Sequence, residues 1–315
     1  MTPQLYEAST VYQVLMPRRG EMNCRCGMSK RLIAILLVIT LGLLAGCAAK
    51  QLVLVEKPKG VTLEYRMPEG AVLKYETTQS SDQTMQMMGM AVETSMSKSY
   101  MFSVAGKGEK GDGYDLEITI DSMDATIGTP QGDFPADVEP VIGQSFSMSI
   151  SRLGKELDLS GAEEIQYGVG PQGARSIKPD FKTLFPDLPE AQVNIGDTWT
   201  TQDTIDVDES GIEIVINSES VNTFTGFETV AGMKCAKVTA AVTGTLKGAG
   251  EQQGAQVSFE GTLSGTETWY FAYEQGLFVQ LSSDIFTKST IDVTGPQEMT
   301  IPMTQTMNFE TALIR

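Results

Sequence analysis

Apolar and polar residues alternate with a period of two along most of the chain after residue 60. In the range 115–121, leucine and isoleucine alternate with aspartate, glutamate and threonine, and the ranges 212–217 and 277–281 follow a similar rule. Such alternation indicates strands that are covered on one face only, as in antiparallel sheets. Turn signals that contain glycine separate the runs, for example at 274–276. The pattern therefore predicts a mainly β fold.

The alternating pattern occurs twice, at a constant offset of 122 residues. The segment 143–160 aligns with 265–282, and Gly154 of the first segment coincides with Gly276 of the second. A repeat of this kind predicts two copies of a unit with four or five strands.

The residues between the two copies, 162–192, lack strand alternation. Short helices are expected at Ser160–Gln166 and at Pro179–Leu184, because glycine and proline interrupt anything longer. One or two short helices cannot cover a sheet of about ten strands. We therefore expect a large antiparallel sheet that curls into a half-barrel or open barrel.

A basic start and an apolar run precede this β body. Met28–Arg31 is cationic, and Leu32–Leu44 is almost purely apolar. The run is too short to span a bilayer and ends in small residues, which is typical of a signal peptide. Residues 1–27 fit no part of such a signal, so translation is expected to start at Met28.

The signal ends in Leu44-Ala45-Gly46-Cys47, which resembles the lipobox of bacterial lipoproteins. This resemblance implies that a signal peptidase recognises Leu44, Ala45 and Gly46 and cleaves before Cys47. It also implies that the Cys47 thiol carries a diacylglycerol with long acyl chains such as palmitate. Two or more acyl chains hold a protein on a membrane stably, whereas one binds only reversibly. Membrane attachment through this anchor is therefore predicted.

The body that follows the anchor is predicted to form one domain over 61–315. The whole chain then divides into an extension upstream of the start (1–27), a lipoprotein signal peptide (28–46), a lipidated tether (47–60), a first β repeat unit (61–161), a linker with a short helix (162–192) and a second β repeat unit (193–315).

Charge and cysteine content narrow the expected partners. The chain carries a formal charge of −17, and removal of 1–46, which holds five Lys/Arg and two Asp/Glu, leaves −20. Nucleic acid and anionic lipid both require clustered cations, so neither is expected as an electrostatic partner. Cys235 is the only cysteine after Cys47. It cannot form an internal disulfide with the acylated residue, and a small buried hydrophobic role is expected for it.

The chain contains no histidine. This removes Ser-His-Asp and Cys-His nucleophiles, histidine-based zinc sites and the usual general base at neutral pH. Acidic residues mostly occupy the polar alternate positions of strands, which favours a solvated face over a catalytic pair of carboxylates. The sequence therefore predicts a protein that is not an enzyme and needs no cofactor.

One segment has part of the composition of a calcium site. Asp206, Asp208 and Ser210 have the oxygen spacing of a calcium loop, but Asn217 stands where a bidentate glutamate is needed. A hairpin turn with surface acids is the favoured interpretation, and weak calcium binding is the alternative.

A methionine cluster over Met85–Met90 is the most unusual local composition. Clustered thioethers suit Cu(I), but strand alternation places Met85 and Met87 on one face and Met88 on the other. Adaptable apolar packing is therefore favoured, and no metal site is assigned.

Several features of the body occur together: a duplicated β pattern, Gly196-Asp197-Thr198-Trp199 after the linker, and Tyr270-Phe271 before Gly276. With the lipobox, the combination resembles a group of bacterial lipoproteins. Its architecture is similar to the half-barrels of LolA/LolB-like lipoprotein carriers. This resemblance implies binding or transport of a lipophilic molecule without covalent chemistry, although those carriers close the concave face with several helices.

Two functions remain open at this point. Aromatic residues such as Trp199, Trp269 and Phe271 face either a filled core or an open cavity, and periodicity does not separate the two. An open apolar groove predicts a protein that binds a lipophilic ligand. A filled core predicts a structural or interaction scaffold of the cell envelope, with an envelope protein as its partner.

The residue after the acylated cysteine bears on the destination of the protein. Ala48 follows Cys47, so the aspartate that signals inner-membrane retention in enterobacterial lipoproteins is missing. The protein is expected to be exported and anchored in the outer membrane facing the periplasm. In a cell without an outer membrane, the outer face of the cytoplasmic membrane is expected.

Overall fold

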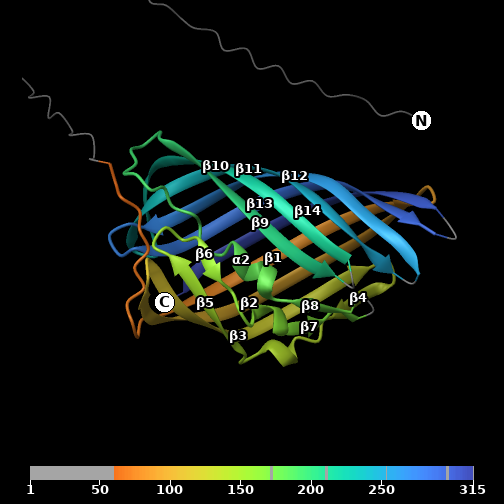
Figure 1. Cartoon of the computed structure of the whole chain (residues 1–315), viewed down its shortest axis with the longest axis horizontal. Helices are drawn as coiled ribbons and strands as arrows, with labels where there is room; N and C mark the ends of the chain where they lie inside the picture. The colour runs from red at the N-terminus through yellow and green to blue at the C-terminus, as the bar shows by residue number, and fades with distance from the viewer. Residues whose placement is uncertain (1–59, 171–172, 210–211, 253, 296–297, 315) are drawn as a thin grey trace, which may run out of the picture. The chain divides into compact units, whose positions relative to one another are not determined.

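The computed structural model describes residues 60–314 except for 171–172, 210–211, 253 and 296–297. The predicted signal peptide, its recognition residues Leu44, Ala45 and Gly46, the lipidation site Cys47 and the tether up to residue 59 therefore lie outside the described residues. The predicted fold class is confirmed, because the described chain is mainly β and forms a curved antiparallel half-barrel (Figure 1).

The half-barrel consists of one 12-stranded sheet in which consecutive strands pair as two meanders. Strand β4 (Gly132–Pro135) pairs with β3 outside the main path. The first meander contains β1 (Val72–Met87), β2 (Met90–Lys110), β3 (Gly113–Thr129), β5 (Ser145–Ser151) and β6 (Glu156–Asp158). The second contains β9 (Thr198–Glu209), β10 (Ile212–Val230), β11 (Met233–Gln252), β12 (Ala255–Ala272), β13 (Leu277–Thr294) and β14 (Met299–Ile314).

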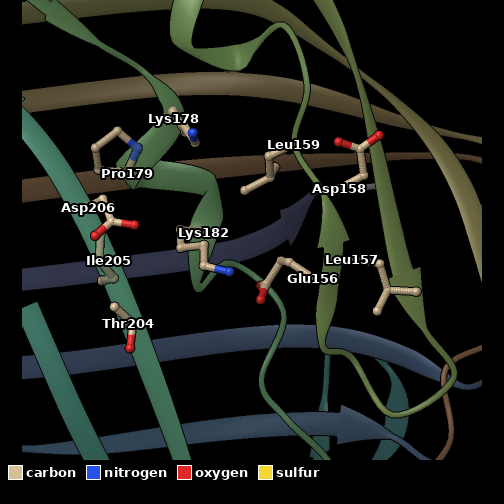
Figure 2. A pocket seen from close by; sticks show the side chains of 10 residues that line it. All are labelled: Glu156, Leu157, Asp158, Leu159, Lys178, Pro179, Lys182, Thr204, Ile205 and Asp206. Atoms are coloured by element: carbon tan, nitrogen blue, oxygen red, sulfur yellow. The ribbon is translucent and has the colours of Figure 1, made fainter.

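The two meanders join where β1 pairs with β14. This antiparallel ladder runs from Lys74 opposite Ile314 to Met85 opposite Met303. The strand order is β6-β5-β3-β2-β1-β14-β13-β12-β11-β10-β9, so β6 and β9 are the two free edges of the sheet. The sheet curls so that these edges face a common seam, which α2 occupies (Figure 2).

The two meanders contain five and six strands among the described residues, so the predicted repeat of two equal units stays a prediction. The aligned glycines occupy corresponding turns, Gly154 between β5 and β6 and Gly276 between β12 and β13. Both have positive φ, at 98° and 73°, which glycine adopts without the steric cost that a Cβ would bring. Glycine thus suits both positions, although the two turns differ, since the Gly154 amide donates to the carbonyl of Ser151 and the Gly276 amide to that of Ala272.

The period-two pattern assigns one face of each strand to the concave side. On β1, Tyr75 and Thr77 are buried while their neighbours Lys74 and Glu76 are exposed. A β-bulge interrupts this rule on β13, next to Tyr270 and Phe271. The alternation over 277–281 predicts that Val279 and Leu281 lie on the same face of the strand. Because of the bulge they pack in different places, Leu281 in the main core and Val279 in a small separate cluster.

The filled core lies at one end of the half-barrel. The segment before β1 crosses this end and buries Leu63, Tyr65 and Met67 against the sheet. The Tyr65 hydroxyl donates to the carbonyl of Pro186 (3.0 Å), and the Arg66 amide donates to the carbonyl of Gly276 (2.9 Å). These bonds fix the crossing segment to the linker and to the second meander.

Little helix is present in the linker, as predicted. It contains a 3-10 turn η3 (Ala162–Glu164), a two-stranded sheet of β7 (Gln166–Gly168) and β8 (Ala174–Ser176), and the helical turn α2 (Lys178–Lys182). A further 3-10 turn, η2 (Glu139–Val141), precedes β5. Among the described residues, no helix is long and apolar enough to cross a membrane.

A single aromatic residue attaches α2 to the concave face. The Phe181 ring packs edge-on against Phe146 (5.0 Å between centroids) and Phe102 (5.2 Å). Burial of one such side chain contributes about 2–3 kcal/mol. Because α2 is only five residues long, this contact rather than helix propensity holds it in the seam.

Candidate functional site

A cavity of about 310 Å³ lies between the concave face of the second meander and the linker. Strands β9 to β14 form its wall, and Glu156 with the residues 179–187 forms its cover. The exposed end of the seam adds a second hollow of about 270 Å³ between β6, α2 and β9 (Figure 2). The two hollows share Glu156, Pro179 and Ile205 in their walls, so the seam forms the mouth of the cavity.

The cavity begins where the filled core ends. Trp269 belongs to the main core and also lines the cavity, and its indole N–H donates to Asn222 Oδ1 (3.4 Å). Trp199 packs edge-on against Trp269 with ring centroids 5.9 Å apart, and its indole N–H donates to the carbonyl of Asp187. Phe271 is fully buried in the core. The aromatic residues thus close one end of the cavity and leave the rest open.

The apolar part of the wall comes from alternate residues of the strands. These side chains share the concave face. The apolar strand residues of the lining are Ile205, Val207, Ile216, Val242, Leu263, Trp269, Leu281, Ile285, Met307 and Phe309, and the cover adds Pro179, Phe185 and Pro186.

Glu156 stands at the mouth, as the first residue of the edge strand β6. Its Oε1 is buried and has no hydrogen-bond partner among the described residues. Burial raises the pKa of this carboxyl to about 9, and the Lys182 ammonium partly opposes that shift. Figure 2 shows the Lys182 and Glu156 side chains directed toward each other. At neutral pH, Glu156 of the free protein therefore carries a proton.

Two aspartates adjoin Glu156. Burial and, to a lesser extent, the nearby Asp203 carboxylate raise the pKa of Asp187 to about 6. Burial also raises the pKa of Asp203, against the influence of Lys182 and Lys155. Like charges in a desolvated site disfavour each other's ionised forms, so the three carboxyls share fewer than three negative charges near neutral pH.

A fourth carboxyl projects from the wall opposite the cover. Glu267 lies on β12 and accepts a hydrogen bond from the Ser283 hydroxyl (3.1 Å). Burial raises the pKa of Glu267, the Ser283 hydrogen bond opposes the shift, and Asp203 adds to it. The cavity therefore combines apolar strands with four acidic side chains from β6, the linker, β9 and β12.

These four acids correct the sequence-based expectation that acidic residues occupy solvated strand faces. Asp203 has the same parity as Ile205 and Val207 on β9, and Glu267 has the same parity as Trp269 on β12. This shared parity with apolar neighbours could have identified Asp203 and Glu267 from the sequence as residues of the concave face. Glu156 and Asp187 lie outside long strands and gave no such signal.

Asp180 also borders the cavity but has its own counter-ion. Lys98 projects from the concave face of β2, and its ammonium contacts both Asp180 carboxylate oxygens at 2.6 and 2.7 Å. The Lys98 side chain is only 2% exposed and lies over the rings of Tyr100 and Tyr167. This pair attaches α2 to the sheet and leaves the other four acids without a buried cation.

The segment with calcium-loop spacing forms a β-hairpin arm rather than a helix-flanked loop. Asp206 and Asp208 belong to β9 and pair with Val215 and Glu213 of β10. Ser210 lies outside the described residues. Within the part of the chain that the structure describes, no three acidic or cysteine side chains converge as a metal site would require.

The methionine cluster forms the β1–β2 hairpin. Met85 and Met87 are half-buried on the concave side, whereas Met88 in the turn is 81% exposed and Met90 is exposed on the next strand. Met88 is thus separate from the other two, but it lies in the turn with a positive φ of 51° and not on the opposite face of a strand as predicted. Cys235 is fully buried, as predicted, and burial raises the pKa of its thiol.

The fold and the site together define a curved antiparallel half-barrel with an acid-lined internal cavity. No family model matches the sequence, and no curated protein matches it. Solved structures with some likeness include an outer membrane channel from Pseudomonas putida F1, at 8% identity and a TM-score of 0.26, covering 79% of this chain and 97% of that one.

Two further solved structures show a similar degree of likeness. A protein with a YmcC-like fold from Bacteroides fragilis is 11% identical with a TM-score of 0.25, over 81% of this chain and 98% of that one. The β domain of the Bordetella autotransporter BrkA is 9% identical with a TM-score of 0.22, and the match covers 77% of this chain and 100% of that one. Values this low support no inference about function.

Proposed function

We propose that this protein binds a small lipophilic ligand in the cavity, without catalysing its conversion. One observation supports the proposal: the concave face of the second meander stays open over about 310 Å³ although the other end of the same sheet is filled. Sites for small molecules usually have volumes of about 300–1,000 Å³ and apolar walls with a few polar groups. The cavity has both properties.

The cost of the cavity strengthens this argument. Protein interiors are close-packed, and side chains that line an unfilled space lose dispersion contacts. Here the chain also retains buried carboxyls beside that space, which adds a desolvation cost. A scaffold with a filled core would need neither feature, so the ligand-binding function accounts for the cavity better than the scaffold does.

We also propose that the protein works outside the cytoplasm, attached to a membrane through acyl chains on Cys47. The support for this comes from the sequence Leu44-Ala45-Gly46-Cys47 and from the apolar run before it. A strongly acidic body lacks the basic surface that binds anionic lipid, so the anchor itself must provide the attachment. The outer membrane, facing the periplasm, is the proposed location.

Nile red, a neutral dye that fluoresces in apolar surroundings, tests the proposed binding site. Ser220 lines the cavity from β10, and the next residue, Val221, is exposed on the convex face. The variant Ser220→Phe should fill the cavity and abolish dye binding, while Val221→Phe should bind like the wild type. Thermal unfolding confirms that both variants remain folded.

Mass spectrometry of gently extracted protein provides a second measurement. Copurified lipophilic molecules should be found with the wild type and Val221→Phe, and should be missing from Ser220→Phe. Dye binding that is equal in the two variants, together with no copurified molecule in any of them, would refute the proposed function.

A further inference from the structure

The charged side chains that line the cavity are all acidic. Glu156, Asp187, Asp203 and Glu267 line it together with Asp180, which Lys98 neutralises. Among the described lining residues there is no lysine or arginine. An anionic ligand such as a fatty acid would therefore find no lysine or arginine to pair with in a desolvated space, which disfavours it.

Two buried acceptor atoms of the lining residues also lack donors. Glu156 Oε1 and Gln79 Oε1 are both inaccessible and have no hydrogen-bond partner among the described residues. Gln79 lies on β1, where its amide nitrogen donates to Met307 Sδ (3.0 Å), and Glu156 lies on the cover. Both side chains line the cavity, so a small rotation of either one would bring its unpartnered oxygen to a ligand that donates hydrogen bonds.

The arrangement suits an organic donor better than a metal ion. A metal ion needs several ligand atoms within about 2–2.6 Å of one point. No three acidic or cysteine side chains of the described residues converge in that way. The four carboxyls instead lie around a space large enough for a chain of several carbon atoms, with apolar side chains such as Leu263 and Ile285 between them.

We propose, on the basis of the lipophilic binding function above, that the cavity selects amphiphiles with a primary ammonium group. The alkyl part lies along the apolar residues of β11 to β14, and the ammonium group lies among the carboxyls near Asp203. Three N–H donors on one positive charge satisfy several acceptors at once, which neither a hydroxyl nor a quaternary ammonium does.

The charges near Asp203 determine how binding depends on pH. The carboxyls of Glu156, Asp187 and Glu267 act on Asp203 or are acted on by it, and the ammonium groups of Lys182 and Lys155 oppose them from the mouth. Asp187, with a pKa of about 6, is protonated at pH 5 and ionised at pH 8. A cation should therefore bind more tightly as the pH rises from 5 to 8.

Three compounds with the same chain test this inference: octylammonium, 1-octanol and octanoate, each used below the concentration at which it forms micelles. Their displacement of Nile red from the full-length protein is measured at pH 7.5. Octylammonium should displace the dye at a concentration at least tenfold lower than octanol, and octanoate should be the weakest. Only octylammonium should gain affinity between pH 5 and pH 8.

Variants show which residues carry the selectivity. Asp203→Asn and Glu267→Gln keep the shape of the side chain and should reduce the preference for octylammonium over octanol to threefold or less, while octanol displaces the dye as before. Glu260→Gln, on the convex face, should leave the preference unchanged.

The outcomes separate the two proposals. Equal displacement by the three compounds would overturn the ammonium selectivity and leave lipophilic binding intact. Equal preference in Asp203→Asn, Glu267→Gln and the wild type would also overturn it. Failure of Nile red to bind the wild type at all would overturn the proposed function itself, and the inference with it.

Discussion

The ammonium of Lys98 lies 2.6 Å from Oδ1 of Asp180 and joins the concave face of β2 to the helix α2. The Lys98 side chain is 2% exposed and that of Asp180 is 16% exposed. The contact spans the space that the half-barrel encloses and holds α2 in the seam between β6 and β9. Together with the Phe181 contacts, it therefore attaches the cover of the cavity to the sheet.

Breaking this ion pair should destabilise the protein. Lys98→Met leaves the Asp180 carboxylate buried without a cation, and we expect a loss of about 3 kcal/mol in the free energy of unfolding. The double variant Lys98→Met/Asp180→Leu should recover most of the loss, because it leaves no unpaired charge. Urea denaturation measures both. Lys247→Met, which removes an exposed ion pair on the convex face, should cost less than about 1 kcal/mol. An equally small effect of Lys98→Met would contradict the structural role of the pair.

Stability should fall as the pH rises from 5 to 9. In the folded protein the pKa of Glu156 is raised from 4.5 to about 9. Its contribution to the free energy of unfolding is therefore fully present below pH 4.5, decreases as the pH rises, and is lost as the pH passes 9. Glu156→Gln should flatten this fall and stabilise the protein by about 2 kcal/mol at pH 8. Melting temperatures across the pH range provide the measurement. Glu260→Gln, at an exposed position, should retain the wild-type slope. A variant Glu156→Gln with an unchanged slope would show that Glu156 is not the titrating group.

The junction of the two meanders depends on a buried pair of hydroxyls. Thr77 of β1 and Thr311 of β14 face each other, and their Oγ1 atoms lie 2.8 Å apart. Thr77→Val leaves the Thr311 hydroxyl without its partner and should cost about 1–2 kcal/mol. The double variant Thr77→Val/Thr311→Val should cost less than the sum of the two single variants. A double-mutant cycle in urea measures the coupling, and strict additivity would argue against the bond.

The turn before β6 should not accept a side chain. A Cβ on Gly154 would lie 2.5 Å from the carbonyl oxygen of Pro186 and 2.6 Å from Cε2 of Tyr65. Gly143 also has positive φ but would meet no atom within 4 Å. Gly143→Ala should therefore lower the free energy of unfolding only by the cost of a left-handed backbone, about 1–2 kcal/mol. Gly154→Ala should lower it by at least about 2 kcal/mol more, because its Cβ also collides with its neighbours. Thermal unfolding of the two variants makes the comparison, and equal losses would mean that the crossing segment does not pack on Gly154 as described.

The proposed anchor can be tested by substitution of Cys47 and of Cys235. Cys47→Ser should abolish incorporation of labelled palmitate and release the protein from the membrane fraction. Cys235→Ser should keep both, because Cys235 is buried and is not the acylation site. Mass determination of the mature N-terminus completes the experiment, and an unmodified Cys47 in the wild type would refute the anchor.

Local chemistry decided the parts of the fold that the sequence could predict. Alternation in segments such as 115–121 requires half-covered strands, and the lack of long helical segments requires that the large sheet curl on itself. The glycine at positions 154 and 276 marked two turns in which that residue has a positive φ. Burial of Cys235 followed from its strand-like surroundings. Each of these features depends on residues close together in the chain.

Only the tertiary structure decided where the concave face is filled and where it is open. Parity places Asp203 on the same face as Ile205, but it cannot show that α2 covers that face or that Glu267 lies across the same cavity. The bulge beside Tyr270 likewise depends on the pairing of β12 with β13. Cavities and pKa shifts arise from distant segments packed in three dimensions, because desolvation depends on everything that surrounds a group and not on its neighbours in the chain.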